Sequence, residues 1–255
     1  MNNPPSPANA EAYLLQVRQV SRVFSDGQVS ALVDVSLSIR RGEYAAIVGP
    51  SGSGKSTLLN LLGALDRPTH GEVLFGGRSL SAIRDIDSLR ACQIGFVFQS
   101  FHLLPTLSAL ENVQIPMFEG PRRSPSERIR KAQELLTIVG LARRMHHLPS
   151  QMSVGERQRT AIARALANDP PLILADEPTG NLDSHSGSAI LDLFDSLHRE
   201  RHVTLVVITH SSDVAQRAER IITLHDGRLV PENESGREFL HPQGHVPAVS
   251  NSTSP

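Results

Sequence analysis

Cysteine is almost absent from this chain of 255 residues, in which Cys92 is the only one. A single cysteine cannot form a disulfide within the chain, and it does not provide the ligand set of a thiolate metal site. So little cysteine is typical of a protein that works in a reducing compartment. The composition therefore favours neither a disulfide-stabilised secreted domain nor a cysteine-based zinc protein.

An excess of one charge and long apolar runs are also missing. Lys and Arg number 25 against 26 Asp and Glu, which predicts neither nucleic acid nor anionic lipid as the main partner. The longest stretch without these four residue types, 91–110, still contains residues that a bilayer core rejects: Gln93, Gln99, Ser100, His102 and Pro105. We expect no transmembrane helix, so a role at a membrane would require another protein.

The patterning predicts an α/β protein. Apolar residues alternate with polar ones from 31 to 39, which indicates a half-buried strand, and the apolar run 44–48 indicates a fully buried one. Similar runs at 172–175 and 203–208 are flanked by helix-like segments. Strands that alternate with helices form a mainly parallel sheet with helices on both faces.

Between these strands the pattern becomes helical. Apolar residues from Ile129 to Val139 recur at helical spacing, and Gly140 follows at the position of a C-terminal cap. We expect a mostly helical lobe over about 91–158, within one domain that spans 13–230. Two segments have no periodicity and a composition that cannot build a core, and they are predicted to be disordered: 1–12 and 231–255.

A phosphate-binding loop is the most specific motif. The segment 49–56 matches the pattern Gly, four residues, Gly, Lys and Ser or Thr, between a predicted strand and a predicted helix. Glycines allow backbone N–H groups to converge on phosphate oxygens, so a nucleotide site is favoured over an ordinary flexible loop. Lys55 is expected to bind the β- and γ-phosphates, and Ser56 to bind Mg²⁺. The predicted nucleotide contacts are Gly49, Pro50, Ser51, Gly52, Ser53, Gly54, Lys55, Ser56 and Thr57.

Acidic residues follow the apolar run 172–175. Asp176 and Glu177 would stand at the carboxyl end of a buried strand, where ligands bind in open parallel sheets. Asp176 is expected to hold Mg²⁺, directly or through water, and Glu177 to act as general base on the attacking water. His210 ends another apolar run on the same rim and is expected to contact the γ-phosphate. The alternatives are solvated acids at a strand end and an ordinary surface or core histidine.

The segment 152–159, Met-Ser-Val-Gly-Glu-Arg-Gln-Arg, resembles the signature of ATP-binding cassette (ABC) ATPases, usually Leu-Ser-Gly-Gly-Gln/Glu. Ser153 and Glu156 also match a capping box that opens a helix. The pair 98–99, Phe-Gln, resembles the Q-loop of that family, and 181–183, Asn-Leu-Asp, resembles its D-loop. The motifs occur in the order of the family, and the chain is identified as a member of it.

The resemblance implies a parallel sheet core, an antiparallel β subdomain and a helical lobe, with ATP and Mg²⁺ at the P-loop. It implies that Gln99 senses Mg²⁺ and the water, and that the following segment meets a membrane partner. Ser153 and Gly155 would close over the γ-phosphate held by a second copy of the chain, and Asp183, in the segment that resembles the D-loop, would also contact the nucleotide. Phe24 resembles the aromatic residue that stacks on adenine, although a strand-end phenylalanine is more often a core residue.

Further segments resemble one group within the family. The stretches 58–66, 110–113 and 175–183 look like those of bacterial lipoprotein-release and macrolide-export ATPases (LolD and MacB types), and the cell-division ATPase FtsE is a close relative. Val154 departs from the pattern, because the first signature glycine usually stands there. A β-branched residue resists positive φ and adds bulk beside phosphate. We interpret the change as a tuned site rather than an inactive one.

The resemblance also implies partners. The chain would dimerise around ATP and drive a transmembrane permease for export or lipoprotein release, from the cytoplasmic face of the cell membrane and without nucleic acid. A regulatory ATPase of a non-transporting envelope or cell-division complex is the alternative. An ABC protein of DNA repair or the ribosome fits less well, because those chains usually carry a long coiled coil, a zinc module or two cassettes.

Overall fold

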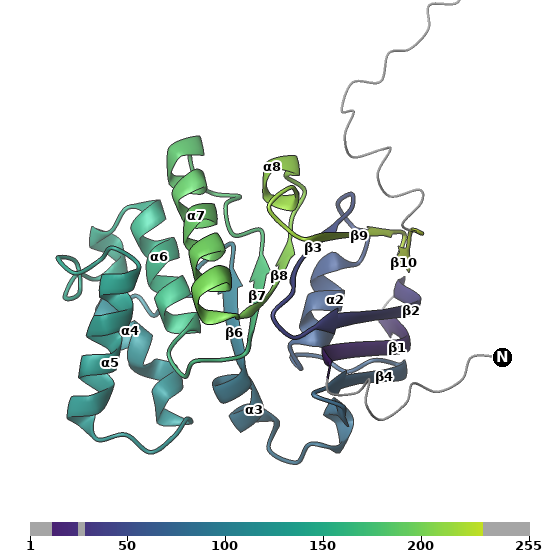
Figure 1. Ribbon diagram of the computed structural model, residues 1–255, viewed down its shortest axis with the longest axis horizontal. Coiled ribbons are helices and arrows are strands. Elements are labelled where there is room, and N and C mark those ends of the chain that lie inside the picture. The colour runs from purple at the N-terminus through teal and green to yellow at the C-terminus, as the bar shows by residue number, and fades with distance from the viewer. Residues whose placement is uncertain (1–11, 25–28, 232–255) are drawn as a thin grey trace, which may run out of the picture.

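The computed structural model describes residues 12–24 and 29–231, and the predicted disordered ends lie outside them apart from Ala12 and Pro231. The described part contains two sheets and a group of helices on one side (Figure 1). Its helices are α2 (Lys55–Leu62), α3 (Ile86–Gln93), α4 (Ala109–Gln114), α5 (Pro125–Ile138), α6 (Val154–Ala165), α7 (Ser184–Arg201) and α8 (Ser212–Ala215).

The larger sheet has the strand order β10-β9-β3-β8-β7-β6. All neighbouring pairs are parallel except β9 and β10, which confirms the predicted mainly parallel core. Because parallel strands end at the same edge, Asp176 on β7 lies beside Ile208 on β8. The strands are β3 (Tyr44–Val48), β6 (Ile94–Phe98), β7 (Leu172–Asp176), β8 (Thr204–Ile208), β9 (Arg220–His225) and β10 (Arg228–Leu229).

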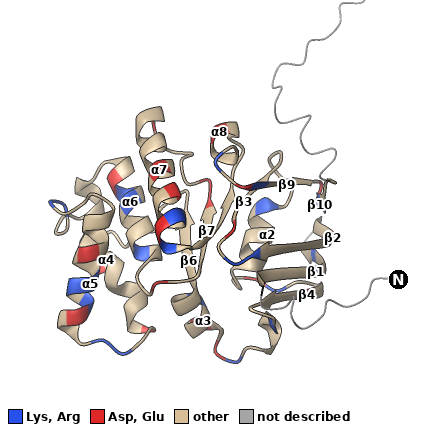
Figure 2. Ribbon diagram, in the orientation of Figure 1, with Lys and Arg blue, Asp and Glu red and all other residues tan. Residues whose placement is uncertain are grey.

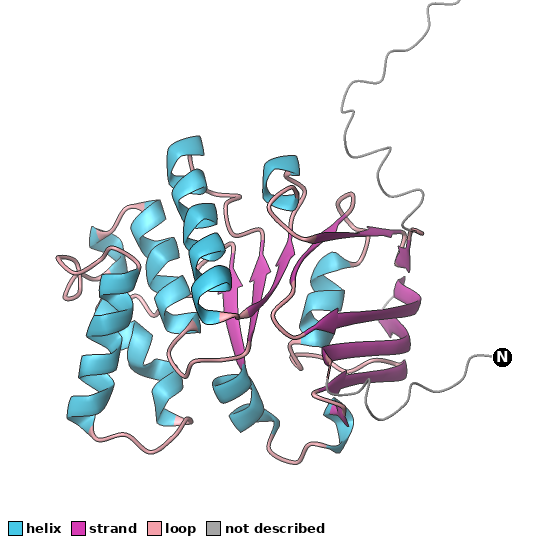
Figure 3. Ribbon diagram, viewed as in Figure 1, coloured by secondary structure: helices cyan, strands magenta, loops and turns pink. Residues whose placement is uncertain are grey.

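The smaller sheet is antiparallel, with the order β2-β1-β4-β5, and it is the β subdomain that the family resemblance implies. Its strands are β1 (Tyr13–Phe24), β2 (Val29–Arg40), β4 (His70–Phe75) and β5 (Arg78–Ser79). Helix α2 lies between the two sheets (Figure 3), and its leucines share one core with residues of β1, β2, β3, β7 and β8. The predicted alternating strand therefore exists, and it extends beyond 31–39 at both ends.

The apolar run of β7 is buried on both faces. Leu172 and Leu174 belong to the core around α2, whereas Ile173 and Ala175 belong to a second core with α4, α5, α6 and α7. A strand with helices on both faces needs apolar residues at every position, which explains why this run shows no alternation.

The predicted start of the helical lobe at about residue 91 is wrong. Residues 94–98 form β6, which pairs in parallel with β7 at the edge of the main sheet. Val97 is fully buried, and a Cβ at Gly95 would lie 2.5 Å from the carbonyl oxygen of Ala165 on α6. The strand is short and covered by α3 and α6, so its sequence lacks the alternation that identifies an exposed strand. The helices α4, α5 and α6 follow it and pack on one another.

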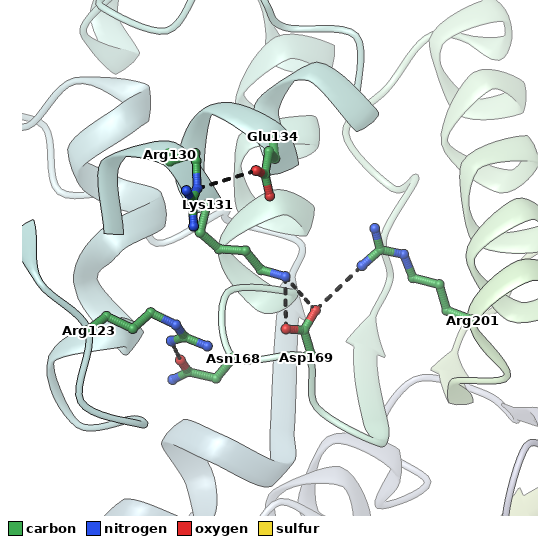
Figure 4. A network of polar contacts seen from close by, with 7 residues as sticks. All are labelled: Arg123, Arg130, Lys131, Glu134, Asn168, Asp169 and Arg201. Carbon is green, nitrogen blue, oxygen red and sulfur yellow. Dashed lines mark hydrogen bonds and ion pairs between the residues drawn. The ribbon is translucent and has the colours of Figure 1, made fainter. Parts of the chain in front are cut away.

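Ion pairs attach this helical group to the rest of the domain. Figure 4 shows Lys131 of α5 and Arg201 of α7 pointing toward Asp169, with nitrogen–oxygen distances of 2.8 and 3.6 Å. Beside them, Arg123 donates to Asn168, whose amide donates to the carbonyl oxygens of Ala91 and Pro116. Figure 2 shows Lys/Arg and Asp/Glu residues interspersed on α5, α6 and α7, which permits such pairing.

Candidate functional site

A cavity of about 710 Å³ opens at the carboxyl ends of β3, β7 and β8, a size ordinary for a small-molecule site. Lys55 comes from the start of α2, Glu177 from the end of β7, and His210 from the end of β8. The chain thus brings together residues that are far apart in the sequence. The cavity is lined by Val29, Ser30, Ala31, Ser51, Gly52, Gly54, Lys55, Ser56, Thr57, Gln99, Asp176, Glu177, Ile208 and His210.

Glycine is required at two positions of the loop between β3 and α2. A Cβ at Gly49 would lie 2.1 Å from the carbonyl oxygen of Leu224 on β9. Gly54 has φ +98°, and a Cβ there would lie 2.3 Å from the carbonyl oxygen of Ala31 on β2. The loop therefore packs directly against the backbones of both sheets, which a larger residue would prevent. The glycines of the P-loop motif permit this close packing.

Lys55 lies across the loop that precedes it. Its Nζ donates hydrogen bonds to the carbonyl oxygens of Gly49 and Pro50 at 2.9 and 2.8 Å. Ser53 is buried, and its carbonyl oxygen accepts the N–H of Gly227, which ties the loop to the turn between β9 and β10. The cavity wall thus combines a cation with the N-terminal end of α2, an arrangement that attracts phosphate.

Asp176 is the half-buried last residue of β7. Burial and the charge of Glu177 raise the pKa of the Asp176 carboxyl, while a hydrogen bond with Ser56 and the charge of Lys55 oppose the rise. Asp176 and Ser56 are thus within hydrogen-bond reach across the cavity. A carboxylate and a hydroxyl form an oxygen donor set that suits Mg²⁺.

Asp176→Asn is expected to stabilise the nucleotide-free protein at neutral pH. The raised pKa means that the folded state holds this proton more tightly than the unfolded chain, so stability falls as pH rises from the unfolded pKa through the folded pKa. An amide loses no proton, and the melting temperature should rise by about 2–4 °C at pH 7, with a weaker pH dependence in the acidic range. Thermal melts of this variant and of Glu200→Gln, an exposed acid on α7, are the measurement. A lower melting temperature for Asp176→Asn at pH 7 would contradict the expectation.

Glu177 is held by side chains from the end of β8. Its Oε1 lies 2.7 Å from Nδ1 of His210, and its Oε2 accepts a hydrogen bond from Oγ1 of Thr209 at 3.3 Å. Its backbone has φ +45°, a left-handed conformation that is unfavourable for a residue other than glycine. The structure therefore brings the predicted base and the predicted histidine into contact, at a strained position of the backbone.

Gln99 follows β6 and lines the same cavity. Its carbonyl oxygen accepts a hydrogen bond from Nδ2 of Asn181 at 2.9 Å. Gly180 lies so near that a Cβ there would be 2.9 Å from Nε2 of Gln99. The segments that resemble the Q-loop and the D-loop therefore contact each other within one chain.

A partly buried arginine anchors the segment after Gln99. The guanidinium of Arg164 on α6 donates to the carbonyl oxygens of Phe101, at 2.6 Å, and of His102. Phe101 and His102 have φ values of +60° and +47°, so this turn needs outside contacts to persist. Burial lowers the pKa of Arg164. The sequence analysis missed Arg164, because nothing in the sequence of a helix shows that one of its arginines binds the carbonyl oxygens of a distant loop.

The signature residues do not line the cavity of their own chain. Ser153 caps α6 in a capping box with Glu156, as predicted, and hydrogen bonds from Ser153 lower the pKa of the Glu156 carboxyl. A Cβ at Gly155 would lie 3.4 Å from Ser186 on α7. Asp183 caps α7 by accepting the N–H of Ser186 at 2.9 Å. These residues therefore lie together at the N-terminal ends of α6 and α7, with Ser153 and Asp183 exposed and Gly155 buried between the helices.

Phe24 is also outside the cavity lining. Phe24 is 40% exposed, and the Arg22 guanidinium lies 4.7 Å from the centroid of its ring. Across the β1–β2 pair Phe24 faces Val29, which does line the cavity. Sequence reasoning missed the wall that Val29, Ser30 and Ala31 provide, because an alternating strand gives no sign of the ligand that it faces.

The comparisons with known proteins decide the family. Residues 32–180 match the family model described as ABC transporter. This chain belongs to the ABC transporter family. It is 51% identical over 220 residues to an uncharacterized ABC transporter ATP-binding protein of Thermotoga maritima, over 85% of this chain and 93% of that protein. The cassette is thus an ABC-type ATPase that binds ATP, as the P-loop and the signature predicted.

The ABC cassette also resembles part of larger proteins. It is 48% identical over 230 residues to the macrolide export ATP-binding/permease protein MacB 2 of Aeromonas hydrophila, over 88% of this chain but 35% of that protein. The chain therefore spans about a third of the length of this relative. Among solved structures, the dimeric post-hydrolysis state of the ATP-binding cassette MJ0796 bound to ADP and Pi has a TM-score of 0.79 and 45% identity, over 85% of this chain and 97% of that chain. The predicted fold class and the resemblance to MacB-type ATPases are confirmed.

Proposed function

We propose that this cassette is the ATP-hydrolysing subunit of a bacterial transporter complex, which energises a membrane permease for export or lipoprotein release. The observation that carries hydrolysis is the cavity where Lys55, Asp176 and the Glu177–His210 pair meet. The permease is inferred from the MacB relatives, whose names join an ATP-binding part to a permease part while this chain matches 35% of one such protein. The same relatives favour transport over a purely regulatory role.

The residues present fit ATP and Mg²⁺. The glycine cradle and the ammonium of Lys55 are suited to the β- and γ-phosphates, with Ser51, Gly52 and Thr57 beside them. The oxygen atoms of Ser56, Gln99 and Asp176 would hold Mg²⁺, which neutralises charge on the phosphates when bound. Phe24 would lie near the adenine, at the edge of the wall that β2 provides.

Glu177 acts as the general base in this proposal. Its carboxylate would accept a proton from the water that attacks the γ-phosphate. His210 and Thr209 hold both carboxylate oxygens in place, which fixes the direction of the base. Lys55 would stabilise the negative charge that the phosphoryl group retains during transfer. The reaction then depends on positioning and electrostatics more than on covalent chemistry.

A second copy of the chain would complete the site. Ser153 and Asp183 are exposed outside the cavity of their own chain, at the N-terminal ends of α6 and α7, so they can meet a nucleotide bound elsewhere, with Gly155 directly behind Ser153 in the first turn of α6. The N-terminal end of α6 offers N–H groups and a positive dipole to a γ-phosphate. Val154 is the first residue of α6 and is not among the residues with positive φ, so its β-branched side chain adds bulk without backbone strain.

The permease would hold the cassette at the cytoplasmic face of the cell membrane. Within residues 12–24 and 29–231, no helix has the length and apolarity needed to cross a bilayer. Leu104 lies in the segment after Gln99 and is 49% exposed. Its backbone is held by the buried side chain of Asn112, which accepts the Leu104 N–H and donates to its carbonyl oxygen. An exposed apolar side chain on a fixed loop is a suitable contact for a permease.

Reconstitution with a MacB-type permease in lipid nanodiscs tests this proposal. The permease should bind the cassette and raise its ATP turnover above the basal rate. Leu104→Asp should abolish the stimulation and keep the basal rate, whereas Leu65→Asp, at an exposed leucine after α2, should behave like wild type. Transport of cargo into vesicles would support export over a regulatory role. A cassette that neither binds nor responds to any MacB-type permease would refute the proposed partner.

A further inference from the structure

Gln158 is a fully buried amide on α6, the helix that begins at the signature. Its Nε2 donates a hydrogen bond to the carbonyl oxygen of Pro178 at 2.8 Å. Its Oε1 is buried and has no protein hydrogen-bond partner within the described residues. A buried amide that makes one hydrogen bond and leaves its oxygen unpartnered gains little net stability, because the desolvation of that oxygen offsets the hydrogen bond. Core stability therefore does not explain a glutamine at this position.

The acceptor of this hydrogen bond belongs to the turn that carries Glu177. Pro178 directly follows Glu177 and has no N–H, so its carbonyl is the only main-chain hydrogen-bonding group that it can use. The turn is otherwise held through Glu177, whose N–H donates to Ile208 and whose carbonyl accepts from Gly180. Because Glu177 is in the left-handed region, a fixed carbonyl immediately after it limits relaxation of the turn.

We propose that Gln158 is a positioning residue, which holds the turn 177–180 through the carbonyl of Pro178 so that the Glu177 carboxylate stays aimed into the cavity. Gln158 is not among the residues that line the cavity, and its hydrogen bond goes to the turn, so it would act through this turn. The inference rests on the proposed role of Glu177 as general base. It gives the signature helix a second task, because the helix that starts at Ser153 also fixes the base of its own chain.

Gln158→Met tests the proposal, because it removes the amide and keeps an unbranched side chain of similar size. The kcat for ATP hydrolysis should fall about 10- to 100-fold, because the displaced Glu177 carboxylate would no longer be aligned with the attacking water. KM and ATP affinity should stay near the wild-type values, since the phosphate loop is untouched. The melting temperature should change little, because removal of the unpartnered Oε1 offsets the loss of the hydrogen bond to the buried carbonyl of Pro178. A variant with lowered kcat and a little-changed melting temperature would support a positioning role over a structural one.

Thr160→Val is the matched control. Thr160 is also fully buried on α6, and its Oγ1 donates to the carbonyl oxygen of Glu156 within the helix rather than to the turn. The Thr160→Val variant should hydrolyse ATP at the wild-type rate. Gln158→Leu provides a second apolar substitution if the Met variant folds poorly. Wild-type kcat in a folded Gln158→Met or Gln158→Leu protein would overturn the inference.

A double-mutant cycle with Glu177→Gln separates this inference from the assignment of the base. If Gln158 acts through Glu177, adding Gln158→Met to Glu177→Gln should lower turnover little further. If the double variant instead lost turnover by the product of the two single-variant factors, the link to Glu177 would be overturned. Wild-type turnover in Glu177→Gln alone would instead refute Glu177 as the base, and with it the ground for this inference.

Discussion

Glu177→Gln is expected to lower kcat for ATP hydrolysis by roughly 10²–10⁴-fold, the usual contribution of a positioned general base. The amide keeps the shape of the side chain but accepts no proton from water. Its contacts with Thr209 and His210 can persist, so the cavity should stay intact. ATP binding should remain near wild type. Because the nucleotide stays uncleaved, an ATP-bound dimer should accumulate, whereas hydrolysis in the wild-type protein would dissociate it.

The measurement combines steady-state turnover, ATP affinity by calorimetry and size-exclusion chromatography with ATP. Glu134→Gln is a suitable control, because Glu134 is an exposed acid on α5 that pairs loosely with Arg130 at 3.8 Å. The control should match wild type in all three assays. Turnover close to wild type in Glu177→Gln would contradict the base assignment.

Ser153→Arg is expected to abolish turnover while leaving ATP binding to the monomer. Ser153 lies outside the cavity that holds Lys55 and Asp176, so the bound nucleotide of the same chain should not meet it. A large cation at the start of α6 would replace a small hydroxyl at the surface proposed to close over the γ-phosphate of the partner. ATP-driven dimerisation and turnover should therefore be lost together.

Ser124→Arg controls for the loss of a helix cap. Ser124 caps α5 in the same kind of capping box, with Glu127, as Ser153 makes with Glu156 on α6. Both variants lose a cap whose removal costs about 0.5–2 kcal/mol, but only the change at Ser153 should abolish turnover. Equal turnover in the two variants would rule out a two-site sandwich for this chain.

The elements that depend on local chemistry follow from the sequence alone. The P-loop needs its glycines and Lys55 at fixed spacing, and the capping box at Ser153 needs only residues within one turn. The acids after β7 are predictable because a buried strand must end at the rim of the sheet. These are short-range rules, so the loop between β3 and α2 and the start of α6 lie where the sequence predicts them.

Contacts between distant segments were decided by the tertiary structure. The sequence pattern predicts that residues 94–98 belong to a helical lobe. They form β6 instead, because β7 pairs with them and α6 packs on them. The hydrogen bond from Gln158 to Pro178 depends on how α6 packs beside the turn 177–180. The left-handed backbone of Glu177 is likewise imposed by its surroundings, since isolated residues of this type avoid that conformation. The sequence determined which groups are predicted to carry the chemistry, and long-range packing decided where they are held, because that packing depends on the whole chain at once.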